Sequence, residues 1–472
     1  MSDTSTDDRP AVAPAVTGPR ALAYAARLMG PSITSGVILR RPAAMALAEK
    51  VDADAATLAA MRELRLRYGS APVHLALPGR TIAVVLDPAD VRRILVDSPE
   101  DFTAANREKI GALGPFQPHG VLISRGRVRD ERRAFNEQVL DTPQPLHHLA
   151  SAFVAVVDEE VDTLLSGPRA GALSGPGAGA LSGPGAGAPR SVSADEFLQL
   201  WWRVVRRVVL GASARDDETV TDRLRSLRRN GNWSYFIPPR RRARDRFIED
   251  LYSYVDAAEP NSLAAVVAHS RVGGAVDPVG QMPQWLFAFD AAGMATLRAL
   301  ALLASHPDLE RRAVEEASAG DVGRPQALPF LRACILESLR LWPTTPAILR
   351  DSTVDTEWES SSSTRVVRAG TAFAILASGF HRDADALPFA DRFSPDIWLD
   401  GTAEQYPQLV PFSAGPVVCP GQNLVLFTAS SMLASILARS GVALTNPALA
   451  PSRPLPPTLN TYGVELSLEP RT

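Results

Sequence analysis

The chain has 472 residues, of which 46% are hydrophobic, and its formal net charge is −3. This length and composition are typical of a globular protein with one very large domain or two to three ordinary ones. The slightly negative charge argues against general nucleic-acid binding, because no excess positive charge is available to displace counterions. The two cysteines, Cys334 and Cys419, provide no disulfide framework, which favours a reducing cytoplasmic location.

The N-terminal part of the sequence predicts a leader followed by a small β-region. Residues 1–20 are polar or interrupted by proline and are expected to be disordered, with a single domain over 21–472. No stretch here approaches the roughly 20 apolar residues that span a bilayer, so no membrane contact is expected. A helical pattern over 52–68 then precedes a strand pair over 72–87.

The next part alternates helices with irregular segments. Residues 102–121 contain several helix breakers and are predicted to form a long loop. The sequence Ala-Gly-Ala-Leu-Ser-Gly-Pro-Gly begins at Ala170 and again at Ala178. Its composition cannot build a core, so 167–190 is predicted to be a flexible insertion.

Two buried helices are predicted in the C-terminal half. The segment 285–306 is apolar nearly all round, which is typical of a helix inside the core. The segment 330–341 is a second such helix, and it carries Glu337 and Arg340. Because these two residues are three apart, they lie on one helix face and can form an ion pair.

The most distinctive stretch, 409–423, is centred on Cys419. An apolar helical pattern follows it, so the cysteine is expected where a loop enters a helix, with Pro420 in the first turn. The unpaired amides of that helix end would favour a thiolate. Gly415 and Gly421 would let the loop lie flat against a large planar ligand. The alternative is a buried, inert cysteine.

The pattern Phe412-x-x-Gly415-x-x-x-Cys419-x-Gly421 resembles the haem-binding loop of the cytochrome P-450 family, in which the cysteine thiolate is the proximal iron ligand. The resemblance implies the mainly α P-450 fold with a small β-region. It also implies haem b as the cofactor, Cys419 as the metal ligand, and Phe412, Gly415 and Gly421 as residues beside the haem. An Arg or His usually stands two residues before the cysteine, and here that residue is Val417.

The segment Ala292–Thr296 is similar to the family's distal oxygen-binding motif, which implies catalytic roles for Gly293 and Thr296. An acid normally precedes the threonine, but this chain has Ala295, and Asp290 is too far round the helix to be assumed a substitute. The alternative for Thr296 is a hydroxyl bonded to the backbone of its own helix.

The resemblance also assigns arginines to the haem propionates. Arg350 matches one such arginine, and either Arg132 or Arg133 matches another, with ordinary exposed helix residues as the alternative. The family's tryptophan four residues earlier falls on Val128 or Arg129. Glu337 and Arg340 match the family's structural pair. Its usual third member, an arginine, falls on Ile397.

Together these matches imply a haem-thiolate monooxygenase of the soluble bacterial type, which oxidises an apolar secondary metabolite. No flavin or nicotinamide segment is fused, so electrons are expected from a separate ferredoxin or flavodoxin with its reductase. One alternative is a peroxide-driven or non-redox member of the family, and another is a haem-free helper protein. The expected substrate pocket has four residues: Phe287, Phe289, Ala291 and Ala292.

Overall fold

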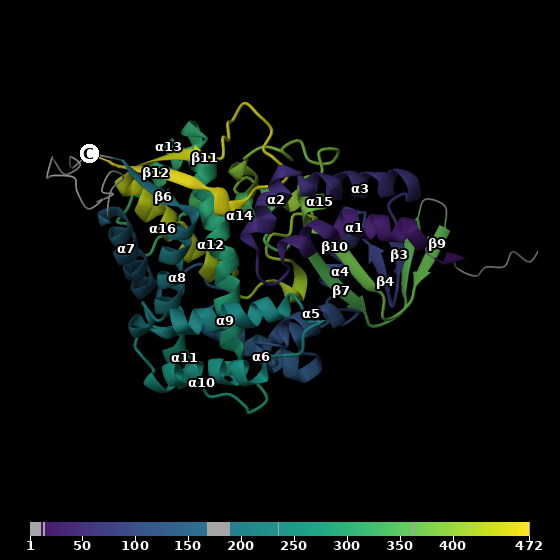
Figure 1. Ribbon diagram of the computed structural model, residues 1–472, viewed down its shortest axis with the longest axis horizontal. Coiled ribbons are helices and arrows are strands. Elements are labelled where there is room, and N and C mark those ends of the chain that lie inside the picture. Colours follow the sequence, from purple (N-terminus) through teal and green to yellow (C-terminus); the bar gives the residue numbers. More distant parts are fainter. Residues whose placement is uncertain (1–10, 13–14, 168–188, 235, 361–362, 472) are drawn as a thin grey trace, which may run out of the picture.

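The computed structural model describes residues 11–12, 15–167, 189–234, 236–360 and 363–471. The described part is mainly helical, with small sheets toward its edges (Figure 1). Most of the insertion predicted at 167–190 lies outside the described residues. The α-helices are α1 (Gly18–Ser35), α2 (Pro42–Lys50), α3 (Ala53–Tyr68), α4 (Pro88–Val96), α5 (Arg107–Leu113), α6 (Gly126–Val139), α7 (Ala150–Ser166), α8 (Ala194–Leu210), α9 (Glu218–Gly231), α10 (Arg241–Ala257), α11 (Leu263–His269), α12 (Met282–Ala304), α13 (Pro307–Ser318), α14 (Pro329–Leu341), α15 (Ala377–His381) and α16 (Gln422–Arg439).

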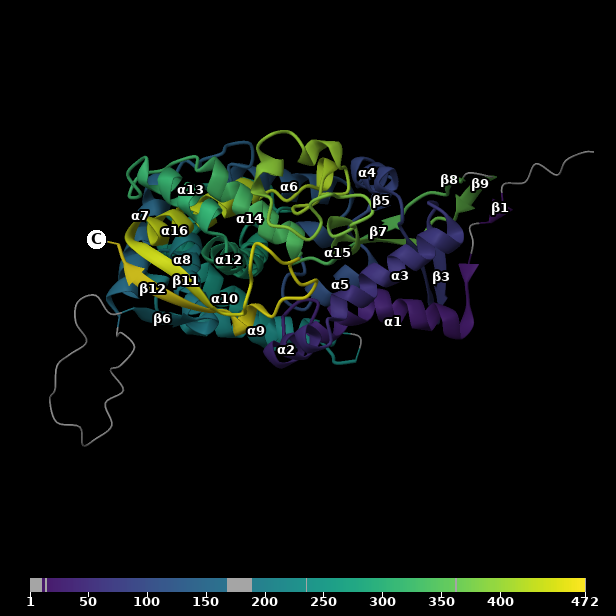
Figure 2. The same cartoon turned by 90° about the horizontal axis from the view of Figure 1, so that it is seen from above.

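Three sheets accompany the helices in the described part. The largest has the strand order β2-β3-β4-β10-β7-β5, the second β1-β9-β8, and the third β11-β12-β6. The first two lie together at one side of the molecule and the third at the other (Figures 1 and 2). Their strands are β1 (Ala11–Val12), β2 (Ala15–Val16), β3 (Val73–Leu77), β4 (Arg80–Val84), β5 (Phe102–Thr103), β6 (Arg190–Ser193), β7 (Ala347–Ser352), β8 (Thr356–Ser360), β9 (Ser363–Val367), β10 (Ala372–Leu376), β11 (Ser440–Asn446) and β12 (Glu465–Pro470).

Helix α12 runs through the centre of the helical half, with α8, α14 and α16 packed around it (Figure 1). The segment Val279–Ala304 is long and apolar enough to cross a membrane by length and composition. However, 78% of its most apolar window is buried inside the protein. This burial on all sides explains the absence of a polar face, as the sequence predicted for a core helix.

The N-terminal boundary differs from the expected one at residue 21. Strand β2 pairs with His74 and Leu75 of β3, and α1 begins at Gly18. Part of the predicted leader therefore belongs to the fold. A two-residue strand gives no periodic pattern in the sequence, because its pairing is decided by a strand far along the chain.

The segment 102–121 is not one continuous loop, since it contains β5 and α5. Helix α5 begins after Asn106, whose side-chain oxygen accepts a hydrogen bond from the Lys109 N–H at 2.8 Å. This cap satisfies an amide that a short helix leaves unpaired. With seven residues, α5 is too short to show a helical period in the sequence.

The buried pair Glu337 and Arg340 connects α14 to the chain that follows β10. Both residues are fully buried, and Arg340 Nη2 lies 2.6 Å from Glu337 Oε1. Arg340 also donates to the backbone carbonyl groups of four residues: His381, Phe389, Ala390 and Arg392. The pair thus satisfies backbone groups as well as charges, which is what makes burial of two ions tolerable.

Two neutral hydrogen-bond donors take the place of the arginine that usually accompanies the Glu337–Arg340 pair. The Ser394 N–H and the Trp398 indole N–H each donate to Glu337 at 2.9 Å. Ile397, the residue that aligned with the family's arginine, is buried in a small apolar cluster instead. The carboxylate therefore has its hydrogen bonds without a second cation.

His381 connects this network to the cysteine loop. Its Nε2 accepts a hydrogen bond from the Val410 N–H at 3.0 Å, and its carbonyl accepts from Arg340 at 2.8 Å. The neutral ring therefore carries its proton at Nδ1, which has no hydrogen-bond partner among the described residues. Burial, with the nearby charge of Arg340, lowers the pKa of His381 to about 3. This agrees with a structural role for His381.

We expect the free energy of unfolding to fall as the pH drops from about 6.5 toward 3. The unfolded chain binds a proton at His381 that the folded chain excludes, so this part of the stability is present above about pH 6.5 and lost below it. At pH 5 the loss is about 2 kcal/mol. In His381→Gln, whose side-chain oxygen can accept the Val410 N–H, urea unfolding should change less between pH 7 and pH 5. Equal changes in the two proteins would contradict this prediction.

Candidate active site

The cysteine loop is held by its own backbone. The Cys419 N–H donates to the Phe412 carbonyl at 3.0 Å, and the Val418 N–H donates to the Gly415 carbonyl at 3.0 Å. Helix α16 begins at Gln422, so Cys419 lies at a loop-to-helix junction as predicted. Pro420 does not lie in the first helical turn, however, but in the turn that precedes it.

The two glycines of the loop differ in backbone conformation and in the space around them. Gly415 has φ +65°, and a Cβ there would lie 2.1 Å from the Leu95 carbonyl oxygen at the end of α4. Gly421 has φ −90°, and a Cβ would approach nothing closer than Leu140 at 3.8 Å. The space beside Gly415 is thus filled by backbone, so this glycine serves packing against α4 rather than a flat approach to a ligand.

The environment of the Cys419 thiol contains opposing effects. Burial raises its pKa, while the Gly421 amide and the positive charge of Arg133 lower it. Burial is the largest effect on the pKa of Cys419. The helix end alone therefore does not produce the thiolate that the sequence predicted. A thiol bound to a metal ion loses its proton outright, and the amide and guanidinium would then stabilise the sulfur anion.

Three arginines hold the loop around Cys419. Arg133 donates to the Val418 carbonyl at 2.6 Å, Arg129 approaches the Pro416 carbonyl at 3.5 Å, and Arg350 approaches the Ser413 hydroxyl at 3.3 Å. Arg133 is paired with Glu137, and Arg129 with Asp130. Arg350 is almost fully buried and, within the described chain, has no carboxylate partner.

Lys109 adds a further charge beside Arg350. Its Nζ donates to the Leu349 carbonyl at 3.1 Å. Burial and the charge of Arg350 lower the pKa of Lys109 well below its usual range. Burial and the charge of Arg129 lower the pKa of Arg350 to about 10. Arg350 is buried and Lys109 is half-buried, so their repulsion disfavours a charge on Lys109 unless an anion lies beside it.

The residues around the loop fit the haem that the resemblance implies. Iron protoporphyrin offers a metal for Cys419 and two propionate carboxylates for cations. Arg350 and Lys109 are such cations, and neither is neutralised by a carboxylate in direct contact among the described residues. Val417 carries no charge, and Lys109 and Arg129 are further cations on this side of the fold that could compensate for the family's missing one. Sequence reasoning missed both, and their spacing from Cys419 gives no signal.

The two neighbouring arginines of α6, Arg132 and Arg133, contact different parts of the structure. Arg133 touches the cysteine loop, whereas Arg132 donates to the Ala275 carbonyl at 3.2 Å and to the Ser124 hydroxyl at 2.7 Å. Arg133 is therefore the member of the pair that the structure brings to Cys419.

The residues of α12 that were expected to act together lie on different faces. The indole N–H of Trp201 donates to the Phe289 carbonyl at 2.7 Å, and a Cβ at Gly293 would lie 2.5 Å from the Trp201 ring. Gly293 thus makes room for Trp201, not for a ligand. Phe287 is two residues before Phe289, hence about 200° round the helix, and its ring packs 5.9 Å from Phe116.

The predicted pocket residues therefore do not form one set. Phe287 and Ala291 are four residues apart on one face and half-buried, whereas Phe289 is buried against Trp201. Ala292 is buried and its carbonyl accepts the Thr296 hydroxyl at 2.8 Å. We retain Phe287, Ala291 and Ala292 as pocket candidates and assign Phe289 to the core.

Proton donors near Thr296 are engaged elsewhere. Its hydroxyl is bonded to its own helix, the alternative considered for this residue. Asp290 forms a partly buried ion pair with Arg228 at 2.6 Å, so its carboxylate is held on another side of α12. Ala295 contributes no side-chain donor, and its carbonyl accepts from the Ser338 hydroxyl at 2.9 Å.

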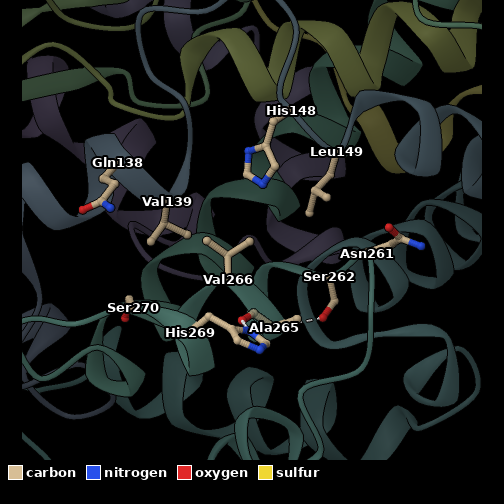
Figure 3. A pocket seen from close by; sticks show the side chains of 10 residues that line it. All are labelled: Gln138, Val139, His148, Leu149, Asn261, Ser262, Ala265, Val266, His269 and Ser270. Atoms are coloured by element: carbon tan, nitrogen blue, oxygen red, sulfur yellow. Dashed lines mark hydrogen bonds between the residues drawn. The ribbon is translucent and has the colours of Figure 1, made fainter.

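A separate cavity of about 340 Å³ lies between the end of α6 and α11, lined by His148 and His269 among others (Figure 3). The side chains of Asp141, His147 and His148 offer ligand atoms within 4.8 Å of one another beside it. However, both ring nitrogens of His147 are bonded to backbone, and His148 Nδ1 is bonded to Asp141 at 2.6 Å. These hydrogen bonds explain the cluster as part of an ordered turn. Thr142, which follows Asp141, donates to the Pro420 carbonyl at 2.7 Å.

We expect Gly415→Ala to lower the free energy of unfolding by more than about 2 kcal/mol, because a side chain there is strained at φ +65° and collides with backbone. Gly421→Ala is the matched control and should change it by less than about 1 kcal/mol. Urea unfolding followed by circular dichroism measures both. Similar losses in the two variants would contradict the close approach of α4.

We expect Lys109→Met to have opposite effects on the protein with and without haem. Removing a half-buried charge that Arg350 repels should raise the stability of the haem-free protein by about 1 kcal/mol. Losing a charged donor should weaken haem binding by about 10- to 100-fold. Urea unfolding and haem transfer to an acceptor protein measure the two effects. Lys50→Met, at the exposed end of α2, is the control, and unchanged haem binding in Lys109→Met would contradict the assignment.

Comparison with known proteins agrees with this site. A model of the family "Cytochrome P450" matches residues 288–448, the segment that holds Thr296, Glu337, Arg340 and Cys419. Probable cytochrome P450 4s3 of Drosophila melanogaster is 34% identical over 149 residues, which cover 31% of this chain and 29% of that protein. Cyclooctat-9-en-7-ol 5-monooxygenase of Streptomyces melanosporofaciens is 32% identical over 146 residues, covering 29% and 31%. The chain thus matches less than a third of the length of these relatives.

The similarity in fold extends much further than the similarity in sequence. The structure of retinoic acid-bound cyanobacterial CYP120A1 matches 87% of this chain and 94% of its own, with a TM-score of 0.66 and 15% identity. The mainly α fold with a small β-region that the resemblance implied is thereby confirmed. The family match and these relatives show that residues 288–448 are a cytochrome P450 sequence, and the proteins of that family bind iron protoporphyrin IX.

Proposed function

We propose that the protein is a haem-thiolate monooxygenase that oxidises an apolar small molecule. The observation that carries the proposal is the cysteine loop, near which Arg350 and Lys109 have no carboxylate in direct contact among the described residues. Arg350 and Lys109 suit two propionates, and Cys419 suits the iron.

The chain's own residues hold and shield the cofactor. Haem, when bound, supplies a redox-active iron that activates dioxygen. Cys419 is kept at the loop by the Phe412 carbonyl, and Arg133 places positive charge near its sulfur. The half-buried faces of Phe287 and Ala291 would accommodate an apolar substrate. Thr296 is the hydroxyl on α12 that can move a proton, after giving up its bond to Ala292.

The remaining features of the proposal concern partners and place. The described chain has no cysteine set for an iron–sulfur cluster, since its cysteines are Cys334 and Cys419. We therefore propose a separate ferredoxin or flavodoxin, with its reductase, as the electron donor. A cytoplasmic location and a secondary metabolite as substrate complete the proposal. The named substrate of the Streptomyces relative is an apolar alcohol, which agrees with this class.

A second function within the same family is favoured by α12. With Ala295 in place of an acid, and with Asp290 paired with Arg228, the usual route for protons to Thr296 is weakened. An enzyme that uses hydrogen peroxide, or one that rearranges its substrate without external electrons, needs less from that route. Turnover with hydrogen peroxide equal to or above turnover with ferredoxin, for the same substrate, would favour this second function.

The test of thiolate ligation is the optical spectrum of the dithionite-reduced protein under carbon monoxide. We expect a Soret band near 450 nm, about 30 nm beyond that of a histidine-ligated haem, because the thiolate donates electron density to the iron. Cys419→Ala should lose this band. Cys334→Ala is the matched control, since Cys334 is buried in α14 and burial raises its pKa well above the usual range.

Two results would overturn the proposal. An identical spectrum in wild type and Cys419→Ala would show that another residue binds the iron. A purified protein without any Soret band, even after incubation with haem, would instead favour a helper protein that resembles the fold without catalysing oxidation.

A further inference from the structure

A second group of charged residues, of which Arg298 is buried and Arg40 and Asp54 are half-buried, surrounds a small cavity away from the cysteine loop. The cavity has about 50 Å³ and is lined by Arg40, Asp54, Arg298, Trp342 and Thr458, among others. Arg40 lies between α1 and α2, Asp54 in α3, Arg298 in α12, Trp342 directly after α14, and Thr458 in the C-terminal loop. About 10–15 Å³ of such space suffices for one water molecule, so the cavity has room for a larger polar group.

Arg298 is the most buried of the charged residues in this group. It is 5% exposed, and it lies on α12 two residues after Thr296. Its Nε donates to the Thr461 hydroxyl at 2.6 Å, and its Nη1 donates to the Trp342 carbonyl at 2.7 Å. Both acceptors are neutral, so hydrogen bonding leaves the charge uncompensated. Burial, together with the charge of Arg40, lowers its pKa to about 10, and it stays protonated at neutral pH.

Arg40 brings a second cation to the same cavity. Its Nη1 and Nη2 donate to the carbonyl groups of Gly36, at 3.1 Å, and Thr344, at 3.0 Å. In the part of the chain that the structure describes, neither Arg40 nor Arg298 forms an ion pair with a carboxylate. Two guanidinium groups that repel each other in a low-dielectric interior are costly to bury.

Asp54 balances only one of these two charges, because its single carboxylate is attracted by both Arg40 and Arg298. Its carboxylate accepts from the Thr458 hydroxyl at 3.1 Å, and burial raises its pKa. The carboxylate of Asp290, which also acts on Arg40, is already paired with Arg228 at 2.6 Å. The group therefore carries at least one excess positive charge, together with cavity space beside the guanidinium groups.

We propose that this cavity is an anion-binding subsite that takes a carboxylate between Arg298 and Arg40. The carboxylate belongs either to a small free anion or to the apolar molecule that the enzyme oxidises. In the second case the subsite sets substrate specificity and rests on the proposed function, whereas anion binding as such does not. A planar carboxylate suits two guanidinium groups, because each offers paired N–H donors.

The experiment uses the protein as purified, with haem bound, and measures carboxylate binding by calorimetry and by the shift in melting temperature. The probes are acetate and dodecanoate, with dodecan-1-ol as the uncharged comparison and sodium chloride to match ionic strength. We expect at least one carboxylate to bind wild type, and Arg298→Gln to raise its Kd about tenfold or more. Acetate binding would identify a free anion. Binding of dodecanoate alone, and more tightly than dodecan-1-ol, would identify a carboxylate carried by an apolar chain.

Two further variants separate anion binding from a structural role. Arg40→Gln, at a less buried position, should also raise the Kd. Asp54→Asn should lower it, because it removes the competing negative charge, and a merely structural role does not predict tighter binding. Equal Kd values in wild type, Arg40→Gln and Asp54→Asn, or no carboxylate binding beyond the chloride control, would overturn the proposal. The shift in melting temperature reports carboxylate binding and does not depend on substrate oxidation. A failure of the anion-binding proposal can therefore be distinguished from a failure of the proposed function.

Discussion

The fully buried ion pair of Glu337 and Arg340 is the interaction on which the geometry of the site depends. Arg340 holds four backbone carbonyl groups after β10, among them that of His381. The His381 ring in turn accepts the Val410 N–H, just before the cysteine loop begins. A rigid helix is thus connected through two polar residues to the loop that presents Cys419. Breaking a buried pair of this kind leaves an unpaired charge in the core, which costs about 3–5 kcal/mol.

Around the cysteine loop, charge rather than shape gives the strongest indication of what the protein binds. The buried Arg350 lies close enough to the half-buried Lys109 to lower the pKa of Lys109, and the described residues supply no carboxylate in direct contact with either. The free-energy cost of burying unpaired positive charge is tolerated in a folded protein when a bound anionic ligand offsets it. The two propionates of haem do so, and they also explain why the loss of a cation at Val417 is tolerated.

Helix α12 shows how one motif serves several purposes at once. Gly293 is set by the close approach of Trp201, and Thr296 is bonded within its own helix. Asp290 is paired with Arg228 on another side. Two residues after Thr296, Arg298 turns from the helix to a polar cavity shared with Arg40. Successive residues of a helix point about 100° apart, so the residues of one short motif face different surroundings. Some of them serve packing, and others serve chemistry or hold charge.

The sequence by itself determined the family, the mainly helical fold, the position of Cys419 before a helix, and the pairing of Glu337 with Arg340. These features depend on local spacing, since a loop, a helix face or a buried helix leaves its pattern within a few residues. Only the tertiary structure decided that Lys109 and Arg129 lie with Arg350, that Arg133 and not Arg132 touches the loop, and that Trp398 takes the place of a missing arginine. It also decided that Phe289 belongs to the core, because Trp201 approaches from a distant helix. Contacts between residues far apart in the chain depend on how helices pack, and a single sequence carries no periodic signal for that packing.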